Sequence, residues 1–350
     1  MINYEQVIKN ITPVNKEVGQ AALTHINNLT KPLGSLGELE KVAVTVAEIT
    51  GEKFPVVSPP GVIVFAADHG VAEQGVSAYP QEVTAQMAIN VLRNGAGINV
   101  FTNAINGLIR IVDVGIKTDL SEESLIVDKV AYGTKNFAKE EAMTRSEAVS
   151  SLEVGMKAAK EIIDSGAKLL IVGELGIANT TASSAVVAAI TQLEVRSLVG
   201  KGTGVDSKAL EHKIAVVEEA LQLHKPNGED GLNVLQKVGG FEIGAMAGAM
   251  LYAASRKIPI LLDGFICTAS ALIASKLSSN VVDYMIGGHQ SVEPGHRAAL
   301  AVLGKKPLIE LQLRLGEGTG AALAYPIVEA ATKMIREMAT FESANISKEN

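Results

Sequence analysis

The spacing of hydrophobic residues changes near residue 60. Before it, apolar positions recur every three to four residues through AALTHINNL (21–29) and again through LGELEKVAVTVAEI (36–49). This spacing is typical of amphipathic helices. Ser35, followed three residues later by Glu38, resembles a capping box, which predicts a helix start there. PVVSPPG (55–61) has the composition of a linker between these helices and the rest of the chain.

After the linker, short aliphatic runs alternate with longer helix-like stretches. The runs at 61–68, 107–115, 168–176 and 258–265 have little polar alternation, which favours strands buried on both faces of a parallel sheet. The intervening segments 83–94, 144–166 and 206–224 have helical spacing. Alternating strands and helices predict a doubly wound, Rossmann-like α/β sheet flanked by helices. A last amphipathic helix at 325–344 is expected to join the N-terminal helices in a small helical domain built from both chain ends.

Composition narrows the class of protein. The 350 residues are 47% hydrophobic but include no Trp and few aromatics, which predicts an aliphatic, alanine-rich core. The net charge of -7 comes without a basic stripe, which argues against nucleic acid as a partner. Cys267 is the single cysteine, so an internal disulfide and a multi-cysteine metal site are excluded. With no signal-peptide pattern and no uncharged apolar segment of about 18 residues, we expect a cytoplasmic protein without a membrane span.

Several predicted strands end in polar or glycine-rich residues. These endings are 68–70, 113–115, 173–176 and 263–264. In a parallel sheet, ligands bind at the carboxyl ends of the strands, where loops and helix N-termini present backbone N–H groups. We therefore expect one shared cleft at these endings. For any single ending the simpler alternative stays open, because Asp and Gly also terminate strands without a function.

The glycine cluster near the C-terminus resembles a dinucleotide-binding turn. Gly316, Gly318 and Ala321 match G-x-G-x-x-A formally. A dinucleotide fold, however, needs a second strand after the helix, with an acidic residue about 20 positions further on. Only a terminal helix follows here, so this match does not indicate a dinucleotide site, and a dehydrogenase is the weakest interpretation.

Two other segments are candidates for holding a phosphate. VGKGTGVDSKAL (199–210) lacks the order G-K-[ST] of a P-loop, but its glycines precede a helix that carries Lys213. Asn179, Thr180 and Thr181 follow another predicted strand and offer hydrogen-bond donors to an anion. Helix capping explains these three residues about as well.

Carboxylates are the remaining candidates for acid–base chemistry. H-E-x-x-H, a cysteine cluster and a nucleophile elbow are all missing, and we expect no metal site. Glu174 and Glu317 are both flanked by glycine, between an apolar run and a predicted helix. Partial burial would raise their pKa toward neutrality, where a general base works best; a solvent-facing loop position is the alternative for each. The residues thus predict an α/β enzyme for a small phosphorylated substrate, with glutamate as its base.

Six ordered segments together resemble one enzyme family. The likeness runs from about Ile26 to about Ile346. The segments are KPLGSLGELE (31–40), FAADHGVAEQGVSAYPQEVT (65–84), GELGIANTTASS (173–184), KVGGFEIGAMAG (237–248), LLDGFICTASA (261–271) and LRLGEGTGAALAYPIVEAA (313–331). With these segments in this order, the chain resembles the nicotinate-nucleotide–dimethylbenzimidazole phosphoribosyltransferases.

The resemblance implies an intracellular homodimeric enzyme of cobalamin biosynthesis, with no metal or redox cofactor. Such an enzyme transfers phosphoribose from nicotinate mononucleotide to 5,6-dimethylbenzimidazole, giving α-ribazole 5′-phosphate and nicotinate. The family's general base falls on Glu317, and its second acidic residue, near the ribose, falls on Glu174. The implied division of the chain is a small helical domain from 1–55, an α/β domain from 60–305, and an active-site loop and last helix from 306–350.

Further substrate-binding positions follow from the same resemblance. Gly316 and Gly318 would let the flat base pack against the backbone, and Asp263 would support the site. Tyr79 and Met87 lie where the best-known members carry a serine and a glutamine near the base. The implied binding set is completed by Leu175, Gly176, Asn179, Thr180, Thr181, Gly202, Lys213, Ser291 and Gly320.

Two alternatives remain at this point. The departures at Tyr79 and Met87 leave the acceptor open to adenine, another benzimidazole or a phenol, and both residues are equally explained as core. A non-catalytic nucleotide-binding or base-sensing module is the alternative from another class, but it has no need of a glycine-flanked base.

Overall fold

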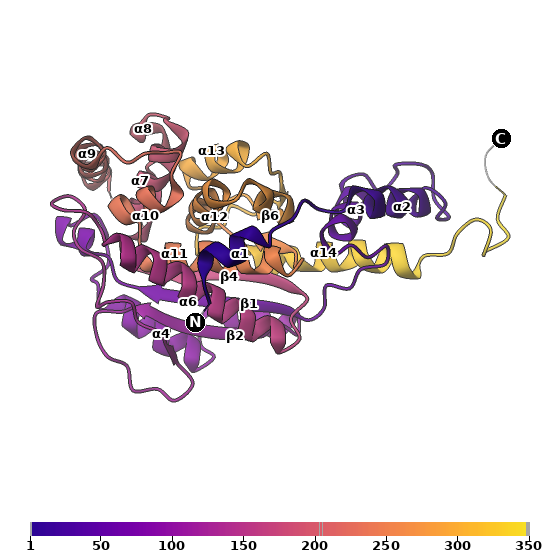
Figure 1. Ribbon diagram of the computed structural model, residues 1–350, viewed down its shortest axis with the longest axis horizontal. Helices are drawn as coiled ribbons and strands as arrows, with labels where there is room; N and C mark the ends of the chain where they lie inside the picture. The colour runs from indigo at the N-terminus through magenta and orange to yellow at the C-terminus, as the bar shows by residue number, and fades with distance from the viewer. Residues whose placement is uncertain (1, 203, 205, 348–350) are drawn as a thin grey trace.

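A parallel β-sheet forms the centre of the molecule. The computed structural model (Figure 1) describes residues 2–202, 204 and 206–347. Within them, seven strands lie in the order β3-β2-β1-β4-β5-β6-β7, and every neighbouring pair is parallel. The strands are β1 (Pro60–Ala67), β2 (Leu108–Gly115), β3 (Ile126–Val127), β4 (Leu169–Leu175), β5 (Ile260–Leu262), β6 (Met285–His289) and β7 (Pro307–Ile309). The strand order reverses between β1 and β4, the place where such sheets bind ligands.

Helices cover both faces of the sheet, which confirms the doubly wound prediction. Along β1, Ile63 and Phe65 face one apolar cluster, while Val62 and Val64 face the other; all four are fully buried. On the first face lie α6 (Arg145–Asp164), α11 (Phe241–Ser255) and α12 (Phe265–Leu277). On the second lie α4 (Val83–Leu92), α5 (Gly97–Ala104) and the start of α14 (Thr319–Glu337). Side chains that alternate along one strand therefore fill two separate cores.

The later part of α14 packs against two N-terminal helices. Val328, Ala331 and Ile335 belong to the same apolar cluster as Ile26 and Val46, and Figure 1 shows α2 and α3 beside the distal part of α14, away from the sheet. The first helix, α1, packs instead against α6 and α11. The division of the chain at 1–55, 60–305 and 306–350 stays a prediction. The remaining helices are α1 (Tyr4–Lys9), α2 (Lys16–Ile26), α3 (Glu38–Thr50), η1 (Gly70–Gln74), α7 (Asn179–Thr191), α8 (Val195–Leu198), α9 (Ser207–His224), α10 (Gly231–Val238), η2 (Ser279–Tyr284) and α13 (Pro294–Val302).

Two local predictions are corrected by the backbone. No side chain caps α3, so the capping box at Ser35 is wrong: Gly37, at φ 53°, is the N-cap, and the Leu36 N–H donates to Glu40 instead. The last helix runs from Thr319 to Glu337 rather than over 325–344. It starts early because the left-handed Gly318 turns the chain directly into the helix. No helix in the described part of the chain is long and apolar enough to cross a membrane.

Candidate active site

A cavity of about 350 Å³ opens at the carboxyl ends of β4, β5 and β6, next to the strand reversal. Residues 314–317, which lead into α14, and the turn at Gly202 complete its wall. Most of the residues predicted for the site line it: Tyr79, Glu174, Leu175, Gly176, Asn179, Thr180, Gly202, Asp263, Ser291, Gly316 and Glu317. The strand endings at 68–70 and 113–115 do not, so the expected shared cleft draws on only part of the sheet edge.

Five predicted residues lie outside the cavity wall. Thr181 is fully buried inside α7, because one helical step turns it away from the face of Asn179 and Thr180. Met87 is half-buried on α4 and packs against the second apolar cluster. Lys213 stands behind the wall, as described below. Gly318 and Gly320 belong to the start of α14, where a Cβ at Gly320 would lie 2.0 Å from the His289 ring.

The loop that carries Glu317 has a left-handed backbone at three consecutive residues. The φ angles are 83° at Gly316, 62° at Glu317 and 91° at Gly318. The loop also lies directly against β4. A Cβ at Gly173 would be 2.0 Å from the carbonyl oxygen of Glu317, and one at Gly316 would be 2.3 Å from Glu174 Oε1. The glycines around Glu317 are therefore required by backbone conformation and close approach, not by a dinucleotide.

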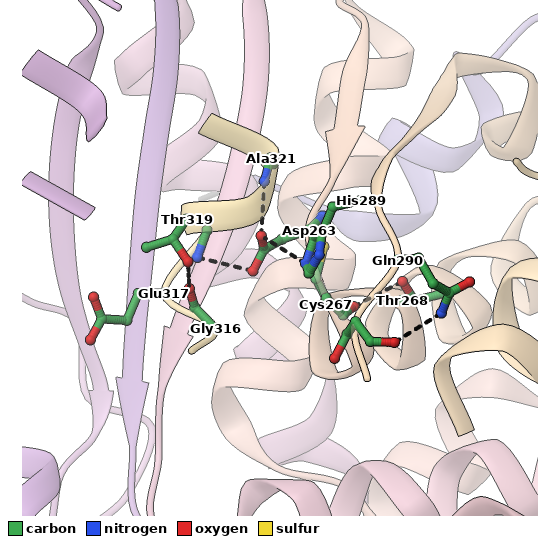
Figure 2. Close-up of polar contacts among 12 residues, drawn as sticks. Asp263, Cys267, Thr268, His289, Gln290, Gly316, Glu317, Thr319 and Ala321 are labelled. Atoms are coloured by element: carbon green, nitrogen blue, oxygen red, sulfur yellow. Dashed lines mark hydrogen bonds and ion pairs between the residues drawn. The ribbon is translucent and has the colours of Figure 1, made fainter. Parts of the chain in front are cut away.

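Asp263, directly after β5, holds this loop in place. Its carboxylate accepts hydrogen bonds from the Gly318 N–H at 3.1 Å and the Ala321 N–H at 2.9 Å, as Figure 2 shows. His289 Nε2 lies 3.6 Å from Asp263 Oδ1. An acidic side chain beside the N-terminus of α14 accepts hydrogen bonds from N–H groups that have no partner within the helix, and it interacts favourably with the positive end of the helix dipole. Burial raises the pKa of Asp263, and His289 and the backbone donors act against that rise. Asp263 thus fixes the start of α14, and with it Glu317.

The Glu317 carboxylate points away from Asp263, as seen in Figure 2. Its Oε2 atom accepts a hydrogen bond of 3.4 Å from the N–H of Ile98, in the first turn of α5. The side chain lines the cavity, yet the residue is only 3% exposed. Burial raises the pKa of Glu317 above its usual range, the Ile98 N–H lowers it, and Asp263 raises it further. A buried carboxylate with a raised pKa is suited to accept a proton at neutral pH.

Glu174 lies beside this loop at the end of β4. Asn179 Nδ2 donates to Glu174 Oε2, and the Glu317 N–H lies 3.4 Å from Glu174 Oε1. Burial raises the pKa of Glu174 well above its usual range, and the nearby Glu242 adds to the rise. The N-cap of α7 is Ala178, at φ 76°, without a side-chain cap. Asn179 therefore holds a carboxylate in the cavity, and helix capping does not explain it.

A buried cation stands behind the part of the wall formed by Thr180 and Gly202. Lys213 Nζ, on α9, donates to Thr180 Oγ1 at 2.8 Å and to the carbonyl oxygen of Gly200 at 3.3 Å. Burial lowers the pKa of Lys213 to about 8, although Glu293 acts in the other direction. Glu293 Oε1 in turn accepts a hydrogen bond from the Gly202 N–H at 3.1 Å. Ammonium, hydroxyl and glycine-turn N–H groups together have the chemistry of an anion site.

Several cavity residues were not predicted from the sequence. His289, Glu293 and Arg314 line the wall. His289 ends β6, whose sequence MIGGH contains two glycines, and these hide the strand pattern that could have pointed to the segment GGHQSVEPGHR (287–297). His296, from the same segment, accepts from the Ser291 N–H through Nδ1, so its other ring nitrogen carries the hydrogen toward Thr268 Oγ1 at 3.0 Å. Burial lowers the pKa of His296 to about 3, which makes it a neutral structural residue. No group of His, Cys, Asp or Glu in the described residues is arranged to hold a metal ion.

Comparison with known proteins identifies the family. A family model described as "Phosphoribosyltransferase" matches residues 11–346. The nicotinate-nucleotide–dimethylbenzimidazole phosphoribosyltransferase of Chloroflexus aggregans is 53% identical over 344 residues, covering 98% of each chain. The enzyme of the same name from Halalkalibacterium halodurans is 48% identical over 99% of this chain and 97% of its own. The crystal structure of CobT from Thermus thermophilus superimposes with a TM-score of 0.91 at 44% identity, covering 95% of this chain and 100% of that one. The chain therefore belongs to the nicotinate-nucleotide–dimethylbenzimidazole phosphoribosyltransferase family.

Proposed function

We propose that this protein transfers phosphoribose from nicotinate mononucleotide to 5,6-dimethylbenzimidazole, giving α-ribazole 5′-phosphate and nicotinate, in assembly of the cobalamin nucleotide loop. Family membership supports the reaction. The observation that carries it is the placement of Glu317: a buried carboxylate lines the cavity on a loop fixed by Asp263 and packed on β4. The same resemblance supports the further proposals that the enzyme is a cytoplasmic homodimer.

The chemistry needs one general base. The bond between C1′ and the pyridinium nitrogen of nicotinate breaks, and its electron pair neutralises that nitrogen, so no acid is required to help it leave. A benzimidazole ring nitrogen forms the new bond to C1′, and the N–H proton of the acceptor passes to the Glu317 carboxylate. Glu174, in its ionised form, lies where it can stabilise the positive charge that develops on the ribose.

The substrate parts match different walls of the cavity. The phosphate is assigned to the side of Thr180 and Gly202, with the Lys213 ammonium behind them. The acceptor base is assigned to the side of Gly316, where Tyr79 stands at the rim with 55% of its surface exposed. A free aromatic face at that position is suited to stack on a flat base. Thr181 and Met87 do not reach the cavity, and their roles in binding stay predictions.

The first test measures nicotinate release from nicotinate mononucleotide, with and without 5,6-dimethylbenzimidazole. For the wild type we expect release that depends on the acceptor. For Glu317→Gln we expect normal folding and a rate lower by about 10²–10⁴-fold, the usual contribution of a general base. Glu337→Gln, an exposed change at the last residue of α14, the helix that follows Glu317, is the matched control and should leave the rate unchanged.

The possible outcomes test the proposed reaction and the assignment of Glu317 as its general base separately. Full activity in Glu317→Gln would contradict the assignment of the base while leaving the reaction intact. A wild type that releases no nicotinate with this acceptor, but does so with adenine or a phenol, would overturn the proposed acceptor alone.

A further inference from the structure

A buried acid–base pair lies behind the cavity and takes no part in its wall. His69 follows β1, and Glu242 stands in the first turn of α11. His69 Nε2 and Glu242 Oε1 are 2.5 Å apart, and both side chains are 0% exposed. Burying two ionisable side chains is weak evidence of a stabilising role, so stability alone is a poor explanation for this pair.

The pair approaches Glu174 through a glycine. A Cβ at Gly176 would lie 3.1 Å from Glu242 Oε1 and 3.3 Å from Asn179 Nδ2. That same Asn179 amide donates to the Glu174 carboxylate. Gly176 therefore lies between the buried pair and the group that holds Glu174, and it has no side chain to separate them.

The pair is held rigidly but retains unused hydrogen-bonding capacity. The His69 carbonyl oxygen accepts from Gln81 Nε2 at 2.9 Å, and a Cβ at Gly240 would lie 2.3 Å from the His69 ring. Among the described residues, neither Glu242 Oε2 nor His69 Nδ1 has a hydrogen-bond partner. Buried polar atoms in folded proteins are normally paired, so these two unpartnered atoms call for an explanation other than packing.

We propose that the His69–Glu242 pair is a positioning element of the active site, which sets the protonation state of Glu174 without touching the substrate. The proposal rests on the proposed function in so far as Glu174 acts on the ribose. With Glu242 negative, Glu174 retains its proton in the empty site. The entry of the cationic pyridinium ring then favours the ionised form: Glu174 releases its proton to water, and its negative charge appears when the substrate is bound.

Other charged groups also face Glu174, and the test must distinguish them. Asp263 after β5 raises the pKa of Glu174, while the backbone N–H of Glu317 lowers it. Burial is the largest cause of the raised pKa of Glu174, and among the charged groups Glu242 has the largest effect. Removing the charge of Glu242 alone should therefore lower the pKa of Glu174 without changing its burial.

The experiment follows the carboxyl groups of the free protein by difference infrared spectroscopy as the pH is raised. The band that disappears in Glu174→Gln identifies the protonated Glu174. In Glu242→Gln, whose amide oxygen can still accept from His69, the midpoint of that band should move to lower pH by about one unit, the scale of a nearby like charge. Glu40→Gln is the matched control, since Glu40 is a buried carboxylate paired with Lys31 at 2.7 Å but lies on α3, among the N-terminal helices.

A midpoint in Glu242→Gln equal to that of the wild type would overturn the proposal, and so would an equal shift in Glu40→Gln. If Glu242→Gln does not fold, Glu242→Asp applies the same test, because the shorter side chain moves the negative charge away from Glu174. The midpoint should then shift in the same direction by a smaller amount. The absence of any shift in this variant would overturn the proposal. The measurement needs no substrate, so its failure is distinguishable from failure of the proposed reaction. In the pH profile of kcat/KM for Glu242→Gln, the limb that depends on Glu174 should also move to lower pH, by the same amount as the infrared midpoint.

Discussion

At the scale of single residues, loss of water decides the charge of the cavity's ionisable groups. Glu174 and Glu317 have raised pKa values, and Lys213 has a lowered one, with burial as the first cause in each. The same side chains on the surface would be ionised over most of the pH range. Burial moves the pKa of each group toward the neutral range, the direction that acid–base chemistry requires.

Lys213 gives a pH prediction. Its ammonium is charged below its pKa of about 8 and neutral above it, so the attraction for a phosphate disappears as the pH rises through that value. We expect the KM for nicotinate mononucleotide to increase above pH 8, and we expect Lys213→Met to raise KM at lower pH and to remove this dependence. Lys208→Gln, an exposed change on the same helix, is the control. Steady-state kinetics on both sides of pH 8 measure the effect, and a KM that stays constant across pH 8 in the wild type would contradict it.

At the scale of elements, the site depends on the contact between the loop before α14 and the end of β4. Three left-handed residues bring the Glu317 backbone onto Gly173, and Asp263 fastens the helix that follows. Without this contact, the carboxylate of Glu317, the proposed base, would not be held at the cavity. Tight packing of this kind transmits even small displacements to the reacting groups.

Gly173→Ala tests this contact. The added Cβ would lie 2.0 Å from the Glu317 carbonyl oxygen, so the loop must move away from β4. A displacement of about 1 Å costs about 10²-fold in rate, and we expect that loss in kcat, with little change in KM for the mononucleotide, whose phosphate binds elsewhere. Gly61→Ala is the control: its Cβ would lie 2.7 Å from that of Ala167, at the opposite end of the neighbouring strand. Equal losses of kcat in the two variants would mean that general destabilisation, not the loop, is responsible.

At the scale of the whole molecule, the buried carboxyl groups of the cavity lower the free energy of unfolding as the pH rises. Several buried carboxyl groups gather at one sheet edge, and the pKa values of Glu174, Asp263 and Glu293 are all raised, burial being the main cause. The folded protein therefore binds more protons than the unfolded chain at mildly acidic pH. By linkage, the free energy of unfolding decreases as the pH rises through the pKa values of the folded state.

Glu174→Gln tests how much of this pH-dependent loss of stability comes from Glu174. The stabilising effect of the protonated Glu174 is fully present below the ordinary glutamate pKa, and it is lost as the pH rises through the raised value of the folded protein. A glutamine stays neutral throughout and can still accept from Asn179. We expect the variant to gain stability relative to the wild type with increasing pH, by about 1 kcal/mol or more. Denaturant unfolding at a series of pH values measures this gain; a constant difference, or one that shrinks with pH, would contradict the prediction, and Glu337→Gln should show no gain.

Elements with a long, local pattern could be predicted from the sequence alone. The strands at 61–68, 107–115 and 168–176 and the helix at 144–166 appear within a few residues of their predicted ends, because continuous apolar runs and helical periodicity report burial directly. Glu317 and Glu174 were also singled out from the sequence, since each is flanked by glycine at the end of an apolar run; both line the cavity, and their catalytic roles stay predictions.

Only the tertiary structure decided what those residues touch. The short strands β3, β6 and β7 carry too few residues to show a period, and only their pairing with neighbouring strands in the sheet defines them. Glu317 meets Glu174 across 143 positions of sequence, and His69 meets Glu242 across 173. Hydrophobic periodicity predicts which face of an element is buried, but it does not say which other element covers that face. The partner, and with it the charge and reactivity of a carboxylate, is set when distant segments come together and exclude water.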